Sequence, residues 1–135
     1  MQLTKKQELG LKIAIERYKN HESWTCIAGY AGTGKSTLVK YIVAALDIPS
    51  EKVVYITYTG KAAEVLREKG CSNAMTAHKL MYHSRQLPNG NFVYKPRSHI
   101  SYSLIIVDEV SMLPKSMWDL LLTYGVPIIA LGDPF

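Results

Sequence analysis

Short apolar runs along the chain alternate with stretches in which apolar residues recur at helical spacing. We predict strands at the apolar runs, over residues 23–28, 52–59, 104–107 and 126–131. The run 104–107 (Leu-Ile-Ile-Val) is apolar throughout, as in a central parallel strand that is buried on both faces. The run 52–59 is rich in β-branched residues and tyrosine, which suit a buried strand.

The intervening stretches are predicted as helices, over residues 4–19, 35–46, 61–69, 76–83 and 114–124. Gly70 suits the position after a helix C-terminus, and Pro114 suits the first turn of a helix. Strands that alternate with helices indicate an α/β fold with a parallel sheet and right-handed crossovers.

One segment departs from this alternation. Asn89-Gly90 is the strongest short signal for a hairpin turn, and Phe92-Val93-Tyr94 follows it as a short strand. We therefore expect a small β-hairpin over about residues 84–100, inserted as an excursion from the main sheet. Trp118 and most of the tyrosines are expected to pack in the core.

Composition is that of a globular protein, with 47% hydrophobic and 20% charged residues in 135 residues, so we expect one domain over residues 1–135. The net charge of +5 suits an anionic partner, although the basic residues form no dense cluster. No apolar run approaches the length of a membrane span, and residues 1–10 lack the apolar core of a signal peptide. These features predict a cytoplasmic protein with no membrane partner.

Residues 29–37 read GYAGTGKST and match the phosphate-binding pattern G-x-x-x-x-G-K-[ST]. Glycines let the backbone curl so that successive N–H groups face phosphate oxygens, and the following helix adds its positive N-terminal end. Lys35 would supply a charge for the β- and γ-phosphates, and the Ser36 hydroxyl would bind Mg²⁺. The motif predicts a site for ATP and Mg²⁺ built from Gly32, Thr33, Gly34, Lys35, Ser36 and Thr37.

Asp108-Glu109 directly follows the apolar run 104–107. In enzymes with this phosphate-binding loop, an acid at the end of a neighbouring central strand faces the Mg²⁺ that accompanies the nucleotide. Asp108 would hold the Mg²⁺ shell, and Glu109 would polarise a water for in-line attack on the γ-phosphate. The alternative is a polar strand end that caps the next turn.

Together these residues resemble the N-terminal RecA-like ATPase domain of superfamily 1 DNA helicases of the RecD and Dda type. The matching motifs occur in the family's order and cover nearly the whole chain: GYAGTGKST at 29–37, TGKAA at 59–63, TAH at 76–78, VDEVSM at 107–112 and LGDP at 131–134. A lone phosphate-binding loop is compatible with many functions, whereas this ordered set is specific.

The resemblance implies an ATP-driven motor on single-stranded DNA, running 5′ to 3′. Gln7 would read the adenine edge, although it also completes a capping box with Thr4, and Asp133 would contribute to the nucleotide site. The track for single-stranded DNA would be formed by Thr59, Lys61, Thr76 and His78.

The hairpin occupies the place where the family inserts a strand-separating pin, and the resemblance puts Phe92 at the fork. Structural alternatives stay open for each position. Lys61 suits an exposed helix start, Thr76 an N-cap, His78 a partly buried histidine with partners inside the fold, and the hairpin a plain surface feature.

The family's motif at 131–134 continues to a γ-phosphate-sensing glutamine, and a second RecA-like domain supplies arginine fingers. We therefore expect this chain to be a fragment that binds Mg·ATP, hydrolyses it weakly and does not unwind DNA by itself. That second domain is its expected partner. A nucleotide or nucleoside kinase is a competing hypothesis, although the arginines do not cluster as a kinase lid requires. A nucleotide-gated binding module is another.

Overall fold

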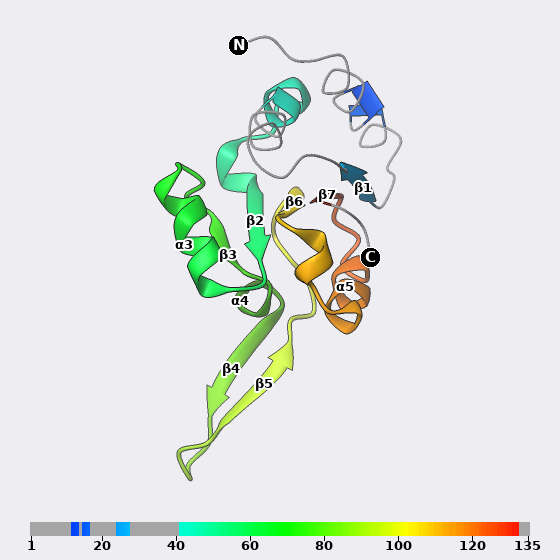
Figure 1. Cartoon of the computed structure of the whole chain (residues 1–135). Helices are drawn as coiled ribbons and strands as arrows, with labels where there is room; N and C mark the ends of the chain where they lie inside the picture. Colours follow the sequence, from blue (N-terminus) through cyan, green and yellow to red (C-terminus); the bar gives the residue numbers. More distant parts are fainter. Residues whose placement is uncertain (1–11, 14, 17–23, 28–40, 133–135) are drawn as a thin grey trace.

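The computed structural model describes residues 12–13, 15–16, 24–27 and 41–132 (Figure 1). A five-stranded sheet in the order β1-β7-β6-β2-β3 forms its centre, and every neighbouring pair of strands is parallel. The strands are β1 (Trp24–Ile27), β2 (Val53–Thr57), β3 (Ala74–Thr76), β6 (Leu104–Val107) and β7 (Ile128–Leu131). The predicted parallel α/β fold is confirmed.

Helices and turns connect these strands. They are α3 (Gly60–Glu68), α4 (Ala77–Met81), α5 (Lys115–Leu122), the 3₁₀ turns η1 (Ser50–Lys52) and η2 (Val110–Met112), and helical segments at 12–13, 15–16 and 41–46. As predicted, Gly70 adopts a positive φ of 101° just beyond α3, a conformation that L side chains rarely adopt. Among the described helices, none is both long and apolar enough to cross a membrane.

Both faces of the sheet are buried. Val54, Ile56, Ile105 and Val107 face one core cluster, which they share with residues of α4, η2 and α5. The alternate residues Val53, Leu104, Ile106 and Ile129 face a second cluster, which includes Ile42 of the helical segment 41–46. Burial on both faces explains why β6 and β7 are continuously apolar in the sequence.

The strand β3 was not predicted. It pairs with β2 over only three residues, with Ala74 opposite Tyr55 and Thr76 opposite Thr57. A three-residue edge strand is too short to show an alternation of apolar and polar residues. The Arg67 guanidinium of α3 donates to the Ala74 carbonyl at 2.8 Å and holds this edge strand against the helix that precedes it.

The hairpin is confirmed, but its predicted bounds of 84–100 were wrong. It pairs β4 (Tyr82–Gln86) with β5 (Phe92–Pro96), and it projects from the body as an arm (Figure 1). Gly90, with a φ of 88°, lies in the loop 87–91, as the Asn-Gly signal predicted. Because paired strands must extend equally from their turn, β4 begins at Tyr82, and α4 ends at Met81 rather than His83.

We predict that Ile106→Ala lowers the free energy of unfolding by about 2–5 kcal/mol, since Ile106 is fully buried in the central strand and its truncation leaves a cavity. Urea denaturation measures this cost. The control Met112→Ala removes a side chain that is 55% exposed and should change stability by less than about 0.5 kcal/mol. Equal effects of the two substitutions would contradict the described core.

Candidate nucleotide and nucleic-acid site

All five strands end at the same edge of the sheet because they are parallel. The register places Ile27 opposite Leu131, and it places Val107 opposite both Ala130 and Ile56. Only β7 separates β1 from β6, so the carboxyl ends of these two strands lie about 10 Å apart. The motif GYAGTGKST begins just after β1 in the sequence, and Asp108 follows β6 directly.

Asp108 continues the backbone ladder of the sheet, because its N–H donates to the Ile56 carbonyl at 2.9 Å. The next residue, Glu109, turns the chain out of the sheet and into η2. It has left-handed backbone angles (φ 51°, ψ 68°), and its carbonyl accepts from the Met112 N–H at 3.0 Å. This conformation costs a residue with a Cβ about 1–2 kcal/mol, and such strained residues cluster at functional sites.

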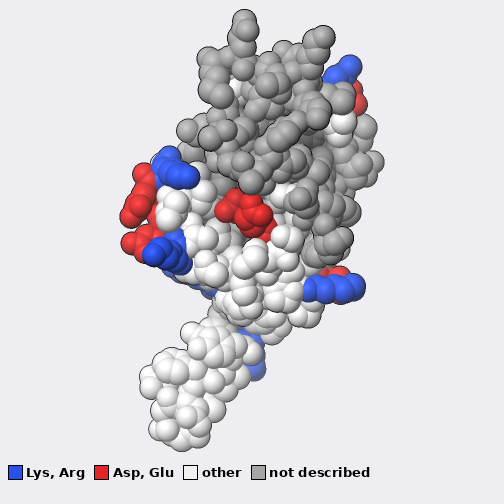
Figure 2. Space-filling model, in the orientation of Figure 1, with Lys and Arg blue, Asp and Glu red and all other residues white. Residues whose placement is uncertain are grey.

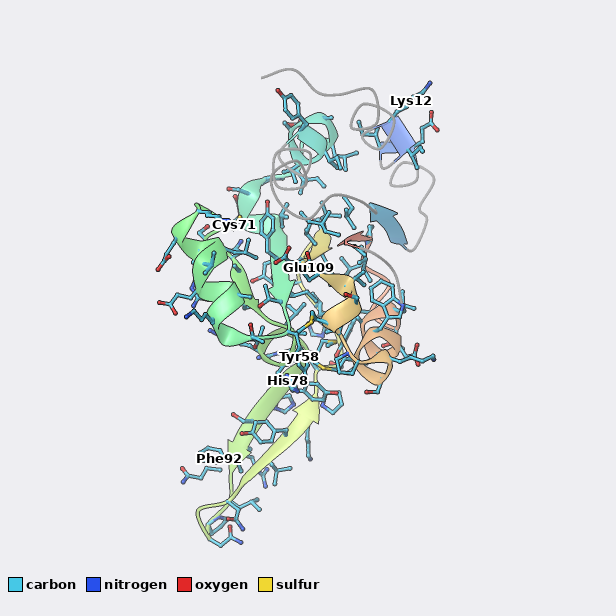
Figure 3. The ribbon with its side chains drawn as sticks, viewed as in Figure 1. Lys12, Tyr58, Cys71, His78, Phe92 and Glu109 are labelled. Carbon is cyan, nitrogen blue, oxygen red and sulfur yellow. The ribbon has the colours of Figure 1, made fainter. Side chains whose placement is uncertain are left out.

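Gly132 directly follows β7 and lies against Glu109, which follows Asp108 at the end of β6. It is buried, has a φ of 100°, and a Cβ built on it would lie 3.1 Å from Glu109 Oε2. Figure 3 shows Glu109 in the middle of the molecule, and Figure 2 shows acidic side chains exposed at that place on this face. The carboxylate therefore faces solvent at the centre of the edge that ends the strands.

The carboxylates of Asp108 and Glu109 supply the hard oxygen donors that Mg²⁺ prefers. The described residues contain no group of three or more side chains able to hold a metal by themselves. These residues fit Mg²⁺ only where further oxygens complete its shell, as nucleotide phosphates and the Ser36 hydroxyl would.

Thr59 and Thr76 are helix N-caps. Thr59 Oγ1 accepts from the Ala62 N–H at 3.2 Å at the start of α3, and Thr76 Oγ1 accepts from the Lys79 N–H at 3.2 Å at the start of α4. The structural alternative for Thr76 is therefore confirmed. A hydroxyl that accepts in a cap still has its O–H to donate, so capping does not exclude a phosphate contact.

His78 is exposed, so the alternative of a partly buried histidine was wrong. Its ring centroid lies 6.2 Å from that of Tyr58 and 5.9 Å from that of Tyr82, which gives a row of three rings between β2 and the hairpin (Figure 3). Thr76, His78, Tyr82 and Tyr94 line a groove of about 930 Å³. The structure thus brings two of the predicted track residues into one groove.

Lys61 is exposed in the first turn of α3, and Phe92 is 56% exposed on the projecting arm (Figure 3). Neither residue lines the groove of His78. The other predicted residues lie outside the described part of the chain: Gln7, Gly32, Thr33, Gly34, Lys35, Ser36, Thr37 and Asp133.

Sequence reasoning missed the exposed tyrosines. Trp118 is buried in the core as expected, whereas Tyr58 is 40% exposed and Tyr94 is 68% exposed. Tyr94 alternates with Lys95 next to the Asn-Gly turn, and the alternation places it on one face of a free-standing hairpin rather than in a core. This alternation beside a hairpin turn was the sequence signal from which the exposure of Tyr94 could have been predicted.

Comparison with known protein families gives a match to the AAA domain over residues 12–134. The chain belongs to the AAA domain family. The match spans the strands that build the candidate site, the hairpin and the motif at 29–37.

Several characterised helicases are similar to this chain. It is 36% identical over 119 residues to the ATP-dependent DNA helicase PIF1 of Trypanosoma brucei brucei, 28% identical over 138 residues to the ATP-dependent DNA helicase dda of Enterobacteria phage T4, and 33% identical over 110 residues to the ATP-dependent RecD2 DNA helicase of Deinococcus radiodurans. These alignments cover 87%, 97% and 79% of this chain, but only 11%, 31% and 15% of the relatives. The resemblance to superfamily 1 DNA helicases is confirmed.

We predict that Gly132→Ala destabilises the fold more than Gly125→Ala does. Both glycines have positive φ, but a Cβ at Gly125 meets nothing within 4 Å, whereas one at Gly132 crowds Glu109. Because the Glu109 side chain is exposed and can shift, this crowding should add about 1 kcal/mol, the low end of the cost of overpacking, to the backbone strain that both variants share. Urea denaturation of the two variants measures the difference, and equal stability would disprove the close packing of Gly132 on Glu109.

Proposed function

We propose that this chain is the ATP-binding and ATP-hydrolysing domain of a DNA helicase that moves along single-stranded DNA in the 5′ to 3′ direction. The observation that carries the proposal is that β1 and β6 end at the same edge of the sheet with only β7 between them. In the sequence, β1 leads into GYAGTGKST and β6 leads into Asp108. A cytoplasmic location belongs to this proposal.

In the proposed nucleotide site, Lys35 neutralises the β- and γ-phosphates, and the backbone of residues 32–37 donates to phosphate oxygens. Gln7 recognises the adenine, and Asp133, which follows Gly132 in the sequence, contributes to the same site. Bound Mg²⁺ would neutralise charge that develops on the phosphate oxygens, with Ser36 and Asp108 holding it.

Glu109 is proposed to orient and polarise the attacking water. Its left-handed backbone turns the chain directly after Asp108, and its side chain is exposed rather than buried. An exposed carboxylate next to a metal-holding carboxylate suits water as the nucleophile. The two acids would therefore divide the work, Asp108 holding the metal and Glu109 the water.

The kinase alternative gains no support from the arginines of the described region. Arg67 is engaged with the Ala74 carbonyl at 2.8 Å, and Arg85 and Arg97 belong to the hairpin and its base. A kinase lid would need arginines over the phosphates.

On the DNA side, we propose that Thr59, Lys61 and Thr76 contact phosphates while the rings around His78 support bases. Phosphate contacts hold a strand without choosing its sequence, and stacking on aromatic rings is equally tolerant of sequence. Phe92, exposed on the arm, is proposed to stack on a base at the fork. Vigorous turnover and strand separation are proposed for a whole helicase, because this chain spans only 11–31% of the length of the helicases that it matches.

Lys35→Ala is predicted to abolish the stabilisation of the chain by Mg·ATP. Ligand at about 100 times its Kd stabilises a protein by about 2.7 kcal/mol, which thermal denaturation detects as a rise in Tm. Lys115→Ala is the matched control because it removes a lysine that pairs at the surface with Asp119, 2.8 Å away. A full Tm rise in the Lys35→Ala variant would remove Lys35 from the site.

Phe92→Ala is predicted to weaken binding of forked DNA by roughly 5- to 150-fold, which corresponds to the loss of one stacked base at about 1–3 kcal/mol. Phe92→Tyr keeps the ring and should bind as the unmodified chain does. Fluorescence anisotropy with labelled DNA measures both. If Phe92→Ala binds normally, the hairpin is a plain surface feature with no contact to DNA at this position.

A further inference from the structure

The net positive charge of the chain lies in one segment that contains no acidic residue. Residues 69–107 contain no aspartate or glutamate, and they carry Lys69, Lys79, Arg85, Lys95 and Arg97. The formal charge of this segment is thus +5, equal to that of the whole chain, and the remainder is balanced. The basic residues alone show no cluster, which is why the sequence analysis did not find this feature.

The hairpin in this segment has two unlike faces. Its register pairs Ser84 with Tyr94 and Gln86 with Phe92 on one face, and alternation puts Tyr82 and Pro96 there as well. That face is uncharged and aromatic. In Figure 2 the visible side of the arm shows no charged side chains along its length, and basic atoms appear only where the arm joins the body.

The opposite face is basic. His83, Arg85, Val93 and Lys95 line one hollow of about 250 Å³, which confirms that they share this face. An adjoining cavity of about 520 Å³ extends the surface to the root of the hairpin and adds Lys79, Arg97 and His99 to its lining. Neither lining contains a carboxylate. Lys79, His83 and Arg97 also line the groove of His78, so Arg85 and Lys95 are the basic side chains of the smaller hollow that the groove does not share. We call the residues of the smaller hollow the basic face.

The basic residues of the hairpin lie close together without compensation. Lys95 is directly opposite His83 and diagonal to Arg85, and among the described residues neither Arg85 nor Lys95 makes an ion pair. Arg85 and Lys95 are diagonal neighbours, and no carboxylate lines the hollow that they share, so a bound polyanion would supply the missing negative charge.

The root of the hairpin is fixed to the body. The backbone N–H of Arg97 donates to the Met81 carbonyl at 2.7 Å. The hydroxyl of Tyr124, which follows α5, donates to the same carbonyl at 3.2 Å. Burial raises the pKa of Tyr124 above its ordinary value, so this hydroxyl stays protonated as a donor. Both faces of the hairpin are therefore held in a defined orientation to the groove of His78.

We propose that the basic face binds the phosphate backbone of the second strand of a DNA fork, while the aromatic face and the groove serve the strand on which the motor moves. This inference rests on the proposed helicase function and adds a second nucleic-acid site to it. Arg and Lys side chains suit contacts to phosphates, which carry no sequence information. The affinity of this site for DNA should therefore not depend on base sequence and should fall as the salt concentration rises.

The test compares two hairpin variants with equal changes of charge. Arg85→Gln/Lys95→Gln removes two positive charges from the basic face, and Ser84→Asp/Gln86→Glu adds two negative charges to the other face one residue away. Anisotropy measures the affinity of each 135-residue variant for a single strand and for a fork with two unpaired arms, over a range of salt. Thermal denaturation checks that all variants are folded.

We expect the unmodified chain to bind the fork more tightly than the single strand. Arg85→Gln/Lys95→Gln should lose that difference, reduce the slope of log K against log salt for the fork by about 1.4–1.8, and leave single-strand binding unchanged. Ser84→Asp/Gln86→Glu should weaken binding of the single strand and the fork alike.

Other results overturn the inference in distinguishable ways. If Arg85→Gln/Lys95→Gln weakens single-strand and fork binding equally, the basic face belongs to the motor strand and the proposed function survives. If this variant retains the fork preference and its salt slope, the basic face serves a different partner, such as an acidic protein surface. If the unmodified chain binds neither DNA, the single-strand function fails together with the inference.

Discussion

All five strands of the sheet pair in parallel, and this pairing determines which residues meet at the candidate site. Backbone hydrogen bonds fix the register of β1 on β7, of β7 on β6 and of β6 on β2, and so fix which residues meet at the end of the sheet. Ile27, Asp108 and Gly132 lie far apart in the sequence and therefore meet at one edge. The sheet that carries them is buried on both faces.

At that edge the backbone is locally strained. Glu109 has a left-handed backbone although it has a Cβ, and Gly132 leaves room for its carboxylate. A Cβ on Gly132 would lie 3.1 Å from Glu109 Oε2, so the absence of a side chain at this position lets the carboxylate keep its place. The sheet that fixes Asp108 and Gly132 stabilises this geometry, which positions one carboxylate at the strand end and another beyond it.

Away from the sheet, the hairpin gains its properties from alternation alone. With no core on either side, both faces of the ribbon remain accessible, and the sequence assigns aromatic residues to one and basic residues to the other. Hydrogen bonds from Arg97 and Tyr124 to the Met81 carbonyl fix the base of the hairpin. The aromatic and basic faces are therefore held in a fixed orientation relative to the body. The proposed nucleotide site and the proposed nucleic-acid contacts are thereby separated, the first at the sheet edge and the second along the groove and the arm.

Much of the fold was predictable because its signals are local. The strand at 104–107, the helix stop at Gly70 and the Asn-Gly turn each depend on a few adjacent residues, and each was found. The strand at 74–76 was missed because its stability comes from β2 and from Arg67, both distant in sequence. For the site, Asp108 and Glu109 were predictable from their place after an apolar strand, but the backbone of Glu109 and its contact with Gly132 depend on β7.

The residues of the predicted DNA track also divide into those with local sequence signals and those whose surroundings depend on residues distant in the sequence. The caps made by Thr59 and Thr76 follow from their position before helical segments. The exposure of His78 and its approach to Tyr58 and Tyr82 depend on where α4 and the hairpin leave the sheet, which no local pattern encodes.

Paramagnetic NMR can show whether a triphosphate and its metal bind at the shared edge of β1 and β6. A non-hydrolysable ATP analogue with Mn²⁺ in place of Mg²⁺ broadens the signals of backbone amides near the metal. We predict strong broadening at Asp108, Glu109 and Gly132 and none at Phe92 on the arm. Bound nucleotide that leaves Asp108 and Glu109 sharp would contradict this prediction.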